Sequence, residues 1–310
     1  MTGDGDKLGV RWGLAGGTEL STVDEVRALA AWAGEAGFDS FWVSQANAVD
    51  PVVALAASFD ACRDLTEVGT SVVPLYGRHP VSLGQLVRTA QSALDGRLTL
   101  GIGPSHAGPV SGTYGLEWDR PFGFTAEFIE GLQPLLEGRP AALEGDQLTA
   151  RAELDIDAPD TPILLAALGP RMLELAGRTV AGTTVGQCGP ITIRTHVAPR
   201  IREAAAAAGR PEPRIMALIR LCVTDDVAGA RALAREIGAR YAAFASYAAV
   251  QAREGLADPG DLHLIGSWEQ VLDGLGRYAE AGVTDFRLEI AASDERSRET
   301  SREALAAHLA

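Results

Sequence analysis

The sequence contains almost no lysine. Of its 27 basic residues only Lys7 is a lysine, and the others are arginines. This excludes an interior lysine that forms a Schiff base or acts as a general base, and it excludes the lysine of a phosphate-binding P-loop. A side-chain cation that holds an anionic ligand must therefore be an arginine, whose planar guanidinium binds through paired donors.

Metal-binding and disulfide patterns are also missing. The cysteines Cys62, Cys188 and Cys222 are far apart, and the five histidines form neither an HExxH nor a His-x-His motif. We therefore expect no disulfide framework, no zinc ribbon and no metal site. The N-terminal segment MTGDGDKLGV lacks an apolar signal core, and no apolar run reaches the ~18 residues of a membrane span. These features predict a soluble, cytoplasmic protein.

The charge balance narrows the possible partners. With 41 acidic against 27 basic residues, the formal net charge is −14 at pH 7. An acidic surface repels phosphate backbones and anionic lipids, so we expect neither a nucleic acid nor a membrane as partner. With 46% hydrophobic residues, the 310-residue chain can fill a large core in one large or two ordinary domains.

Short apolar runs alternate with amphipathic segments along the chain. Eight runs have the near-continuous hydrophobicity of strands in a parallel sheet, at 8–14, 38–43, 67–73, 97–102, 162–167, 183–188, 214–223 and 285–290. The first four begin about every 30 residues, the length of one strand–helix unit. The pattern predicts a single (β/α)8 TIM barrel over 1–310, with insertions after strands 4 and 7. These insertions include a loop at 138–161 and a helix at 226–250.

The segment GIGPSHAG (101–108) follows the fourth strand but is not a dinucleotide fingerprint. That motif needs a glycine three residues after Gly103, where His106 stands instead, and no helix follows at once. The glycines would let a flat ligand approach the backbone, with Ser105 and His106 as hydrogen-bonding groups. His106 is the best ionisable candidate because it follows a strand end, and a structural loop histidine is the alternative.

The segment AALGPRMLELAG (166–177) predicts a strand, a sharp turn and a helix. Pro170 suits the first helical turn, and Gly169 lets the backbone turn sharply. Free N–H groups near Arg171 and Met172, together with the guanidinium, form a candidate anion site. An ordinary capped turn is the alternative interpretation.

The segment TSVVPLYGRHP (70–80) is longer than a strand-to-helix turn needs. Polar Ser71 in an apolar run indicates a bulge that could lie under a planar ring, and a proline-punctuated loop is the alternative. Ser44 and Gln45 close the second strand, and Trp12 closes the first. Because no nucleophile elbow and no paired carboxylates stand at the strand ends, we expect a cofactor to supply the chemistry.

Taken together, these segments resemble the bacterial luciferase-like monooxygenase superfamily. They are most similar to its branch of coenzyme F420-dependent oxidoreductases, related to methylenetetrahydromethanopterin reductase. The resemblance spans about residues 8–287 and keeps the family's order and spacing. The matching segments are EAGFDSFWVSQ, EVGTSVVPLYGRHP, GRLTLGIGPSH, YGLEWDRP, PILLAALGPRMLELAG, the Gly-Pro at 189–190 and YAEAGVTDF.

The resemblance implies a (β/α)8 barrel, usually a homodimer, with a flavin or deazaflavin at the C-terminal mouth. It also implies a non-prolyl cis peptide at Ser71–Val72, behind the ring of the cofactor. The family's ring-edge and ribityl contacts fall on Ser44, Gln45, Gly103, Ser105 and His106, and its phosphate turn falls on Gly169, Pro170, Arg171 and Met172. His106 and Gln45 are the catalytic candidates. The candidates for a substrate pocket are Trp12, Tyr76, Trp118, Gly186 and Gln187.

Two positions depart from the family pattern. Gly186-Gln187-Cys188 stands where relatives carry a bulky Trp-Met pair, which could enlarge the substrate pocket or weaken cofactor binding. Pro104 stands where some F420-dependent relatives place a glutamate proton donor, which leaves His106 or water for that role. The leading hypothesis is hydride transfer between F420 and a small organic substrate. The alternatives are a monooxygenase using reduced FMN and oxygen, and a cofactor-free barrel that binds or rearranges a metabolite.

Overall fold

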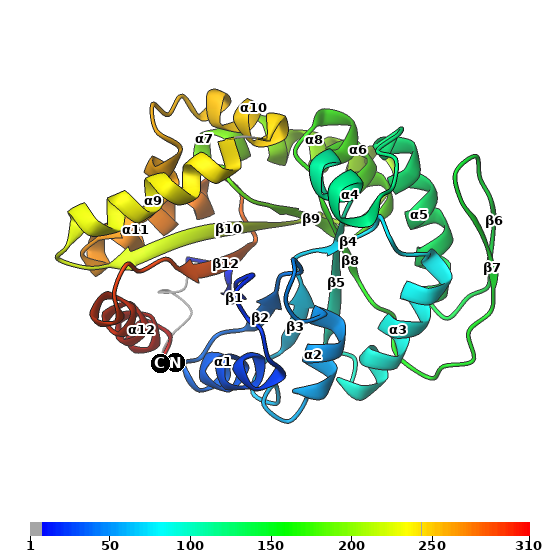
Figure 1. Cartoon of the computed structure of the whole chain (residues 1–310), viewed down its shortest axis with the longest axis horizontal. Helices are drawn as coiled ribbons and strands as arrows, with labels where there is room; N and C mark the ends of the chain where they lie inside the picture. The colour runs from blue at the N-terminus through cyan, green and yellow to red at the C-terminus, as the bar shows by residue number, and fades with distance from the viewer. Residues whose placement is uncertain (1–7, 243) are drawn as a thin grey trace.

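A computed structural model describes residues 8–242 and 244–310. Eight parallel strands form its central barrel: β1 (Arg11–Gly16), β2 (Ser40–Val43), β3 (Glu67–Thr70), β5 (Leu98–Gly103), β8 (Ile163–Ala166), β9 (Gly182–Val185), β10 (Arg214–Val223) and β12 (Asp285–Ile290). β10 pairs with both β12 and β9, which closes the ring (Figure 1). The predicted (β/α)8 barrel is confirmed.

Helices cover the outside of the barrel. They are α1 (Val23–Glu35), α2 (Pro51–Ala57), α3 (Pro80–Ala93), α5 (Pro121–Leu136), α6 (Pro170–Thr179), α7 (Pro190–Thr192), α8 (Ala198–Ala207), α11 (Trp268–Glu280) and α12 (Glu295–Leu309), with a π-helix (Ile193–Val197) between α7 and α8. Their starts follow from the sequence. Thr22 and Ser267 form capping boxes at α1 and α11, and prolines occupy the first turn of α2, α3, α5 and α6.

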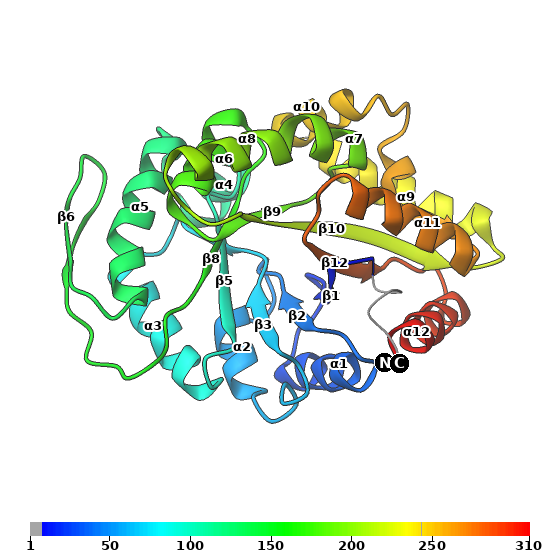
Figure 2. The ribbon, with the colours of Figure 1, turned by 180° about the vertical axis from the view of Figure 1, so that it is seen from behind.

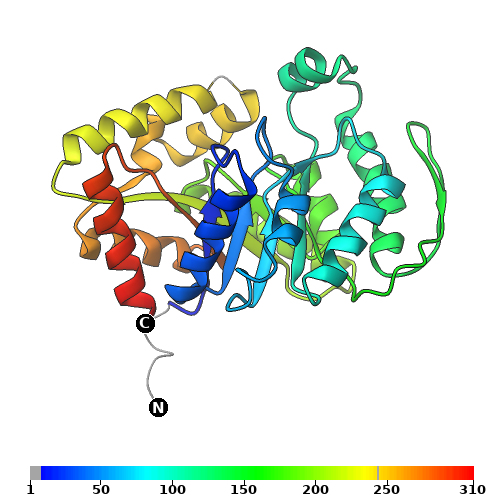
Figure 3. The same cartoon turned by 60° about the horizontal axis from the view of Figure 1, so that its bottom comes forward.

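Two long connections carry further elements. The connection from β5 to β8 includes α4 (Ala107–Tyr114) and the antiparallel hairpin of β6 (Ala141–Glu144) and β7 (Thr149–Ala152), which packs on α3 and α5 at the edge of the molecule (Figure 2). The connection from β10 to β12 includes α9 (Val227–Ala242), α10 (Ala245–Glu254), a 3-10 helix (Pro259–Leu262) and β11 (Leu264–Gly266). In Figure 3, α4 and α9 lie on the same side of the barrel, opposite the C-terminus. A short strand, β4 (Val73–Pro74), follows β3 and pairs with β5.

The elements differ from the sequence-based expectation in three places. β1 begins at Arg11, three residues later than the expected start at residue 8, so Trp12 lies near its beginning and not at its end. The expected loop 138–161 contains the β6–β7 hairpin, whose Ala141 and Leu143 alternate with exposed residues and are buried. The expected helix 226–250 is divided into α9 and α10, and position 243 within that range lies outside the described residues.

Trp42 fills the middle of the barrel interior. Its side chain is fully buried, packs with Met216 and donates a hydrogen bond from Nε1 to Ser40 Oγ (2.9 Å). A Cβ at Gly13 would lie 2.9 Å from Trp42 Nε1, and one at Gly69 would overlap the indole ring. These two glycines therefore leave room for the indole ring inside the barrel.

A charged network lies below Trp42, at the N-terminal ends of the strands. Arg214 donates two hydrogen bonds to the carboxylate of Glu67 (2.7 and 2.9 Å) and two to that of Asp285 (2.6 and 3.3 Å). Arg11 pairs with the same two carboxylates at 2.7 and 3.4 Å. Burial opposes the ionisation of Glu67, but the hydrogen bonds and charge of Arg214 hold its pKa below the usual value. The network therefore remains charged and links β3, β10 and β12.

Candidate functional site

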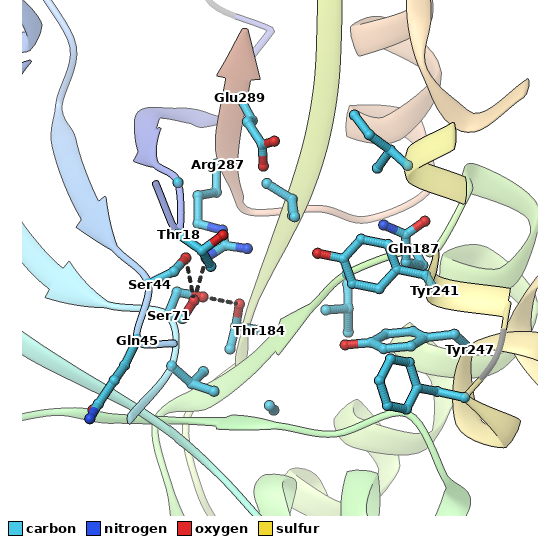
Figure 4. Close-up of a pocket in the computed structure, with 18 of the residues that line it drawn as sticks. Thr18, Ser44, Gln45, Ser71, Thr184, Gln187, Tyr241, Tyr247, Arg287 and Glu289 are labelled. Atoms are coloured by element: carbon cyan, nitrogen blue, oxygen red, sulfur yellow. Dashed lines mark hydrogen bonds between the residues drawn. The ribbon is translucent and has the colours of Figure 1, made fainter. Parts of the chain in front are cut away.

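Two adjoining cavities lie at the C-terminal ends of the barrel strands. The larger, here the main cavity, has a volume of about 620 Å³, and the smaller, the side cavity, has about 290 Å³. Strand-end residues such as Ser44 and Ser71 face Tyr241 and Tyr247 across the main cavity (Figure 4). The residues that line both cavities are Val72, Ser105, His106, Ala166, Thr184, Gly186 and Tyr247. The two spaces are therefore adjacent parts of one candidate site.

The bulge after β3 forms one wall of both cavities. The Ser71–Val72 peptide bond is cis, as the family resemblance implied. The Ser71 carbonyl oxygen accepts hydrogen bonds from Ser44 Oγ (3.0 Å) and from Arg287 (2.7 Å), and Ser71 Oγ lies 3.1 Å from Thr184 Oγ1 (Figure 4). Residues of β9 and β12 and the residue that follows β2 therefore fix the position of the bulge.

A glycine beneath the bulge makes its path possible. Thr70 Oγ1 donates to the Gly101 carbonyl (2.8 Å) and accepts from the Gly101 N–H (3.0 Å). A Cβ at Gly101 would overlap the Thr70 carbonyl oxygen. Only glycine allows this close approach of β3 and β5, because any other residue would push the bulge away.

His106 stands where β5 leads into α4. Ser105 adopts a left-handed conformation (φ 68°) that turns the chain there, and both residues line both cavities. The imidazole stacks on the ring of Phe244, with centroids 4.2 Å apart, and lies 5.5 Å from that of Tyr247. Burial lowers the pKa of His106, so the ring is neutral at pH 7. Gly103, two residues earlier, lines only the side cavity.

Gln45 lies at the rim of the main cavity. Its Oε1 accepts a hydrogen bond from Arg78 (3.1 Å), and the same guanidinium nitrogen contacts Asp50 (2.5 Å). In Figure 4 its side chain points away from Tyr241 and Tyr247. The amide oxygen of this catalytic candidate therefore already has a partner outside the cavity.

The start of α6 faces the side cavity. Gly169 is the N-cap residue and provides no side-chain acceptor for the first N–H groups of the helix. Gly169 and Met172 line the side cavity, whereas Pro170 and Arg171 do not. The Arg171 guanidinium instead lies 4.0 Å from the centroid of the Phe122 ring. The groups of the predicted anion site that face the side cavity are therefore backbone N–H groups. The guanidinium of Arg171, predicted to assist them, is directed towards Phe122 instead.

The five substrate-pocket candidates do not all line a cavity. Gly186 and Gln187 line the main cavity, and Trp118 lines the side cavity. Tyr76 lies behind Trp118, with ring centroids 5.0 Å apart, and donates its hydroxyl to the Asp119 carbonyl (3.1 Å). Tyr76 therefore supports the wall without lining either cavity.

The prediction that Trp12 ends the first strand and lines a substrate pocket is wrong. Its side chain is fully buried, lies edge-on to Phe286 at 5.3 Å between ring centroids and is 5.0 Å from the ring of His308. Because β1 starts at Arg11, Trp12 occupies the second strand position, far from the strand's C-terminal end. It is therefore a core residue between strand and helix.

Several polar residues of the main cavity were missed by the sequence analysis. They are Thr18, Thr184, Arg220, Tyr241, Tyr247, Arg287 and Glu289. Arg220 Nε donates to Glu289 (2.9 Å), and another nitrogen of its guanidinium donates to the Tyr241 hydroxyl (3.2 Å). The strand segments RIMALIRLCV and DFRLEI look like ordinary apolar strands. The available signal was the charged residues inside them, at every second position of DFRLEI and at the first and seventh positions of RIMALIRLCV.

His263 lies behind the main cavity and is buried. With Gln187 and Arg220, which also line the main cavity, it borders a very small internal space, and its Nε2 has no hydrogen-bond partner. Burial, reinforced by the charge of Arg220, lowers its pKa to about 4. The fold therefore holds this imidazole in its neutral form.

Acidification is expected to destabilise the protein through His263. Its folded pKa lies below the unfolded value near 6.5, so the unfolded chain binds more protons as the pH falls from 6.5 towards 4. The resulting loss of stability between pH 7 and pH 5 is about 2 kcal/mol. Urea unfolding of the wild type and of His263→Gln at both pH values measures it. An equal pH dependence of the two proteins would contradict this assignment.

Comparison with known protein families agrees with the geometry of this site. The family model described as luciferase-like monooxygenase matches residues 10–285. The chain belongs to the luciferase-like monooxygenase family. Relatives of the chain include a reductase and F420-dependent dehydrogenases, and the protein is an enzyme of the oxidoreductase type.

One curated relative is similar to the chain in sequence, and two solved structures share its fold. The chain is 27% identical to 5,10-methylenetetrahydromethanopterin reductase of Methanolobus tindarius over 70% of this chain and 67% of that protein. An F420-dependent secondary alcohol dehydrogenase, solved in complex with an F420-acetone adduct, aligns with a TM-score of 0.79 at 21% identity, covering 95% and 98% of the two chains. The oxygenating constituent of 3,6-diketocamphane monooxygenase of Pseudomonas putida, solved in complex with FMN, aligns with a TM-score of 0.78 at 19% identity, covering 97% and 98%.

The described residues lack two further kinds of feature. No group of three or more His, Cys, Asp or Glu side chains there is arranged to hold a metal ion. Across residues 8–242 and 244–310, every helix is too short or too polar to span a membrane.

Proposed function

We propose that this protein is an F420-dependent oxidoreductase that transfers a hydride between the deazaflavin and a small organic substrate. The observation that carries the proposal is the continuity of the site. The wall formed by Ser71 and Val72 and the uncapped start of α6 at Gly169 border the same pair of cavities. A flat ring with a phosphate-bearing tail needs these two features, a platform and an anion site, at opposite ends of one space.

The residues present fit such a ligand. A Cβ at Gly186 would meet only Leu218, at 3.9 Å, and one at Gly169 would meet no atom within 4 Å, so both glycines leave open space beside the backbone. Val72 lines both cavities and provides an apolar surface for a ring. Ser44, Gly103, Ser105 and His106 would surround the ring and the chain that leads from it, and the backbone of the turn from Gly169 to Met172 would hold the phosphate, whereas Gln45 and the Arg171 side chain are directed elsewhere.

Deazaflavin, when bound, supplies or accepts the hydride. The protein's part is to hold protons and exclude water. His106 is neutral at pH 7 and can accept or donate a proton. Burial raises the pKa of Tyr247 to about 12, so its hydroxyl stays protonated at neutral pH. This hydroxyl faces the cavity opposite Thr184 (Figure 4). The stack of His106 on Phe244 joins the two long connections beside the cavity.

Cofactor titration tests the proposal. Quenching of F420 fluorescence by the purified protein should saturate, and FMN should bind at least tenfold more weakly. Reduced F420 should also bind. Tight FMN binding without F420 binding would reject the proposal and favour the monooxygenase alternative. Failure of both cofactors to bind would favour the cofactor-free alternative.

The monooxygenase alternative has its own support. The fold is shared with an enzyme solved with FMN, and a platform at Ser71–Val72 would accept either tricyclic ring. Oxygen consumption with a flavin reductase and reduced FMN would distinguish this function. The homodimer and the cytoplasmic location stay predictions.

A further inference from the structure

Arg287 is a buried cation without a counter-ion. It lies on β12 with 6% exposure, and its hydrogen bond goes to an uncharged acceptor, the Ser71 carbonyl. Its Nε has no hydrogen-bond partner. The arginines beside it in the barrel are neutralised: Arg214 pairs with Glu67 and Asp285, and Arg220 pairs with Glu289. Within residues 8–242 and 244–310, no carboxylate forms an ion pair with Arg287.

Such an arrangement is unfavourable for the unliganded protein. Burial lowers the pKa of Arg287 to about 10, which still leaves the guanidinium charged at neutral pH. An unpaired buried charge is costly, and proteins normally compensate it with an opposite charge or a full set of hydrogen bonds. Because Arg287 lines the main cavity, a ligand can provide that compensation.

A second unsatisfied donor lies across the same cavity. Gln187 follows β9 in a left-handed conformation (φ 56°), is 5% exposed, and its Nε2 has no hydrogen-bond partner. Figure 4 shows Gln187 and Arg287 extending from opposite sides of the cavity. Two buried side chains, each with an unpartnered nitrogen, therefore border one space.

The charges around the cavity define the ligand further. Glu289 neutralises Arg220, and Arg240 lies at the exposed end with Glu236 3.9 Å away. Arg287 is thus a cavity arginine without a direct ion pair, and the carboxylates of Glu289 and Glu19, which also line the cavity, would repel a dianion. A single negative charge on a planar group matches one guanidinium. Leu218, Ile237 and Phe244 also line the cavity and suit an apolar remainder.

We propose that the substrate is an organic monocarboxylic acid whose carboxylate binds Arg287 and whose largely apolar remainder carries one polar group that reaches Gln187. This inference rests on the proposed function, because it assigns the substrate of the same site. The hydrogen bond from Arg287 to the Ser71 carbonyl places the carboxylate beside the bulge, next to the position proposed for the ring. Arg287 thus selects the substrate by charge and orients it towards the reacting face.

Calorimetric titration of the cofactor-free protein with benzoate, benzamide and inorganic phosphate tests the substrate class. Benzoate should bind at least tenfold more tightly than its neutral isostere benzamide, and phosphate should bind more weakly than benzoate. Arg287→Met should remove the preference for benzoate. The matched control Arg240→Met changes an arginine that lines the same cavity at its exposed end, and it should keep benzoate affinity within twofold.

Further measurements distinguish a wrong substrate assignment from a wrong cofactor assignment. Gln187→Met, which keeps the charge of Arg287, should weaken the binding of 4-hydroxybenzoate, whose hydroxyl oxygen accepts a hydrogen bond, by about threefold and leave benzoate affinity unchanged, so the proposal can be tested even if Arg287→Met does not fold. F420 quenching with saturating benzoate should give an unchanged F420 affinity. Competition would assign Arg287 to the cofactor and overturn the proposal, as would equal binding of benzoate and benzamide or a preference for phosphate. Absence of F420 quenching without benzoate would instead reject the proposed function.

Discussion

Arg214→Met should lower the free energy of unfolding by about 3–5 kcal/mol, the usual result of removing one partner from a buried ion pair. Arg214 makes hydrogen bonds to both Glu67 and Asp285, whose side chains are 9% and 2% exposed. Without it, the cation that remains beside the two carboxylates is Arg11, whose own side chain is 40% exposed. The remaining attraction is therefore screened, and the buried charges lose most of their compensation.

Urea unfolding at pH 7 measures this effect, with a surface pair as the control. Arg151 contacts Glu144 on the β6–β7 hairpin, where both side chains are more than 60% exposed. Arg151→Met should therefore change stability by less than about 1 kcal/mol. If Arg214→Met is no more destabilising than Arg151→Met, the network at the N-terminal ends of the strands is not a stabilising feature.

Gly169→Val is expected to lower F420 affinity at least a hundredfold, equivalent to about 2.7 kcal/mol. The valine fits the fold, because Gly169 has an extended conformation (φ −78°, ψ 153°) and a Cβ there meets no protein atom within 4 Å. The new side chain instead enters the open space in front of the first N–H groups of α6. A phosphate would lose several backbone hydrogen bonds at once, each worth roughly 1.5–3 kcal/mol.

Arg171→Ala is the matched comparison for this prediction. Arg171 is the next residue but one, yet its guanidinium stacks on Phe122 and does not line the side cavity. Its removal should lower F420 affinity by less than about threefold, as for a distant, screened charge. Fluorescence titration at two salt concentrations, with circular dichroism to check the fold, gives both values. Unchanged affinity in Gly169→Val would remove the phosphate turn from the proposed site.

The sequence predicts the barrel well because each strand is buried on both faces and each helix has a recognisable start. The run RIMALIRLCV, for example, corresponds to the full extent of β10. Strand ends are less certain, since β1 could slide by several residues within LGVRWGLAGG without losing its apolar character. That uncertainty explains why Trp12 was assigned to the pocket although it lies in the core.

The polar half of the candidate site was harder to predict. Tyr241 and Tyr247 belong to α9 and α10, which are held over the cavity by tertiary contacts that no local pattern encodes. Arg287 and Glu289 lie inside a strand, where a charged residue is equally compatible with a structural ion pair such as that of Arg214. The three-dimensional structure is needed to see that Arg214 is paired with carboxylates whereas Arg287 faces a cavity.

The indole of Trp42 has a consequence for how this enzyme can diversify. It occupies the barrel between the network of Glu67, Arg214 and Asp285 and the cavity above, so the two ends share no side chain. Effects of substitutions at sites without shared partners usually add. A lineage, or a protein engineer, can therefore exchange cavity residues such as Gln187 to reach new substrates while the stabilising end of the barrel is inherited unchanged.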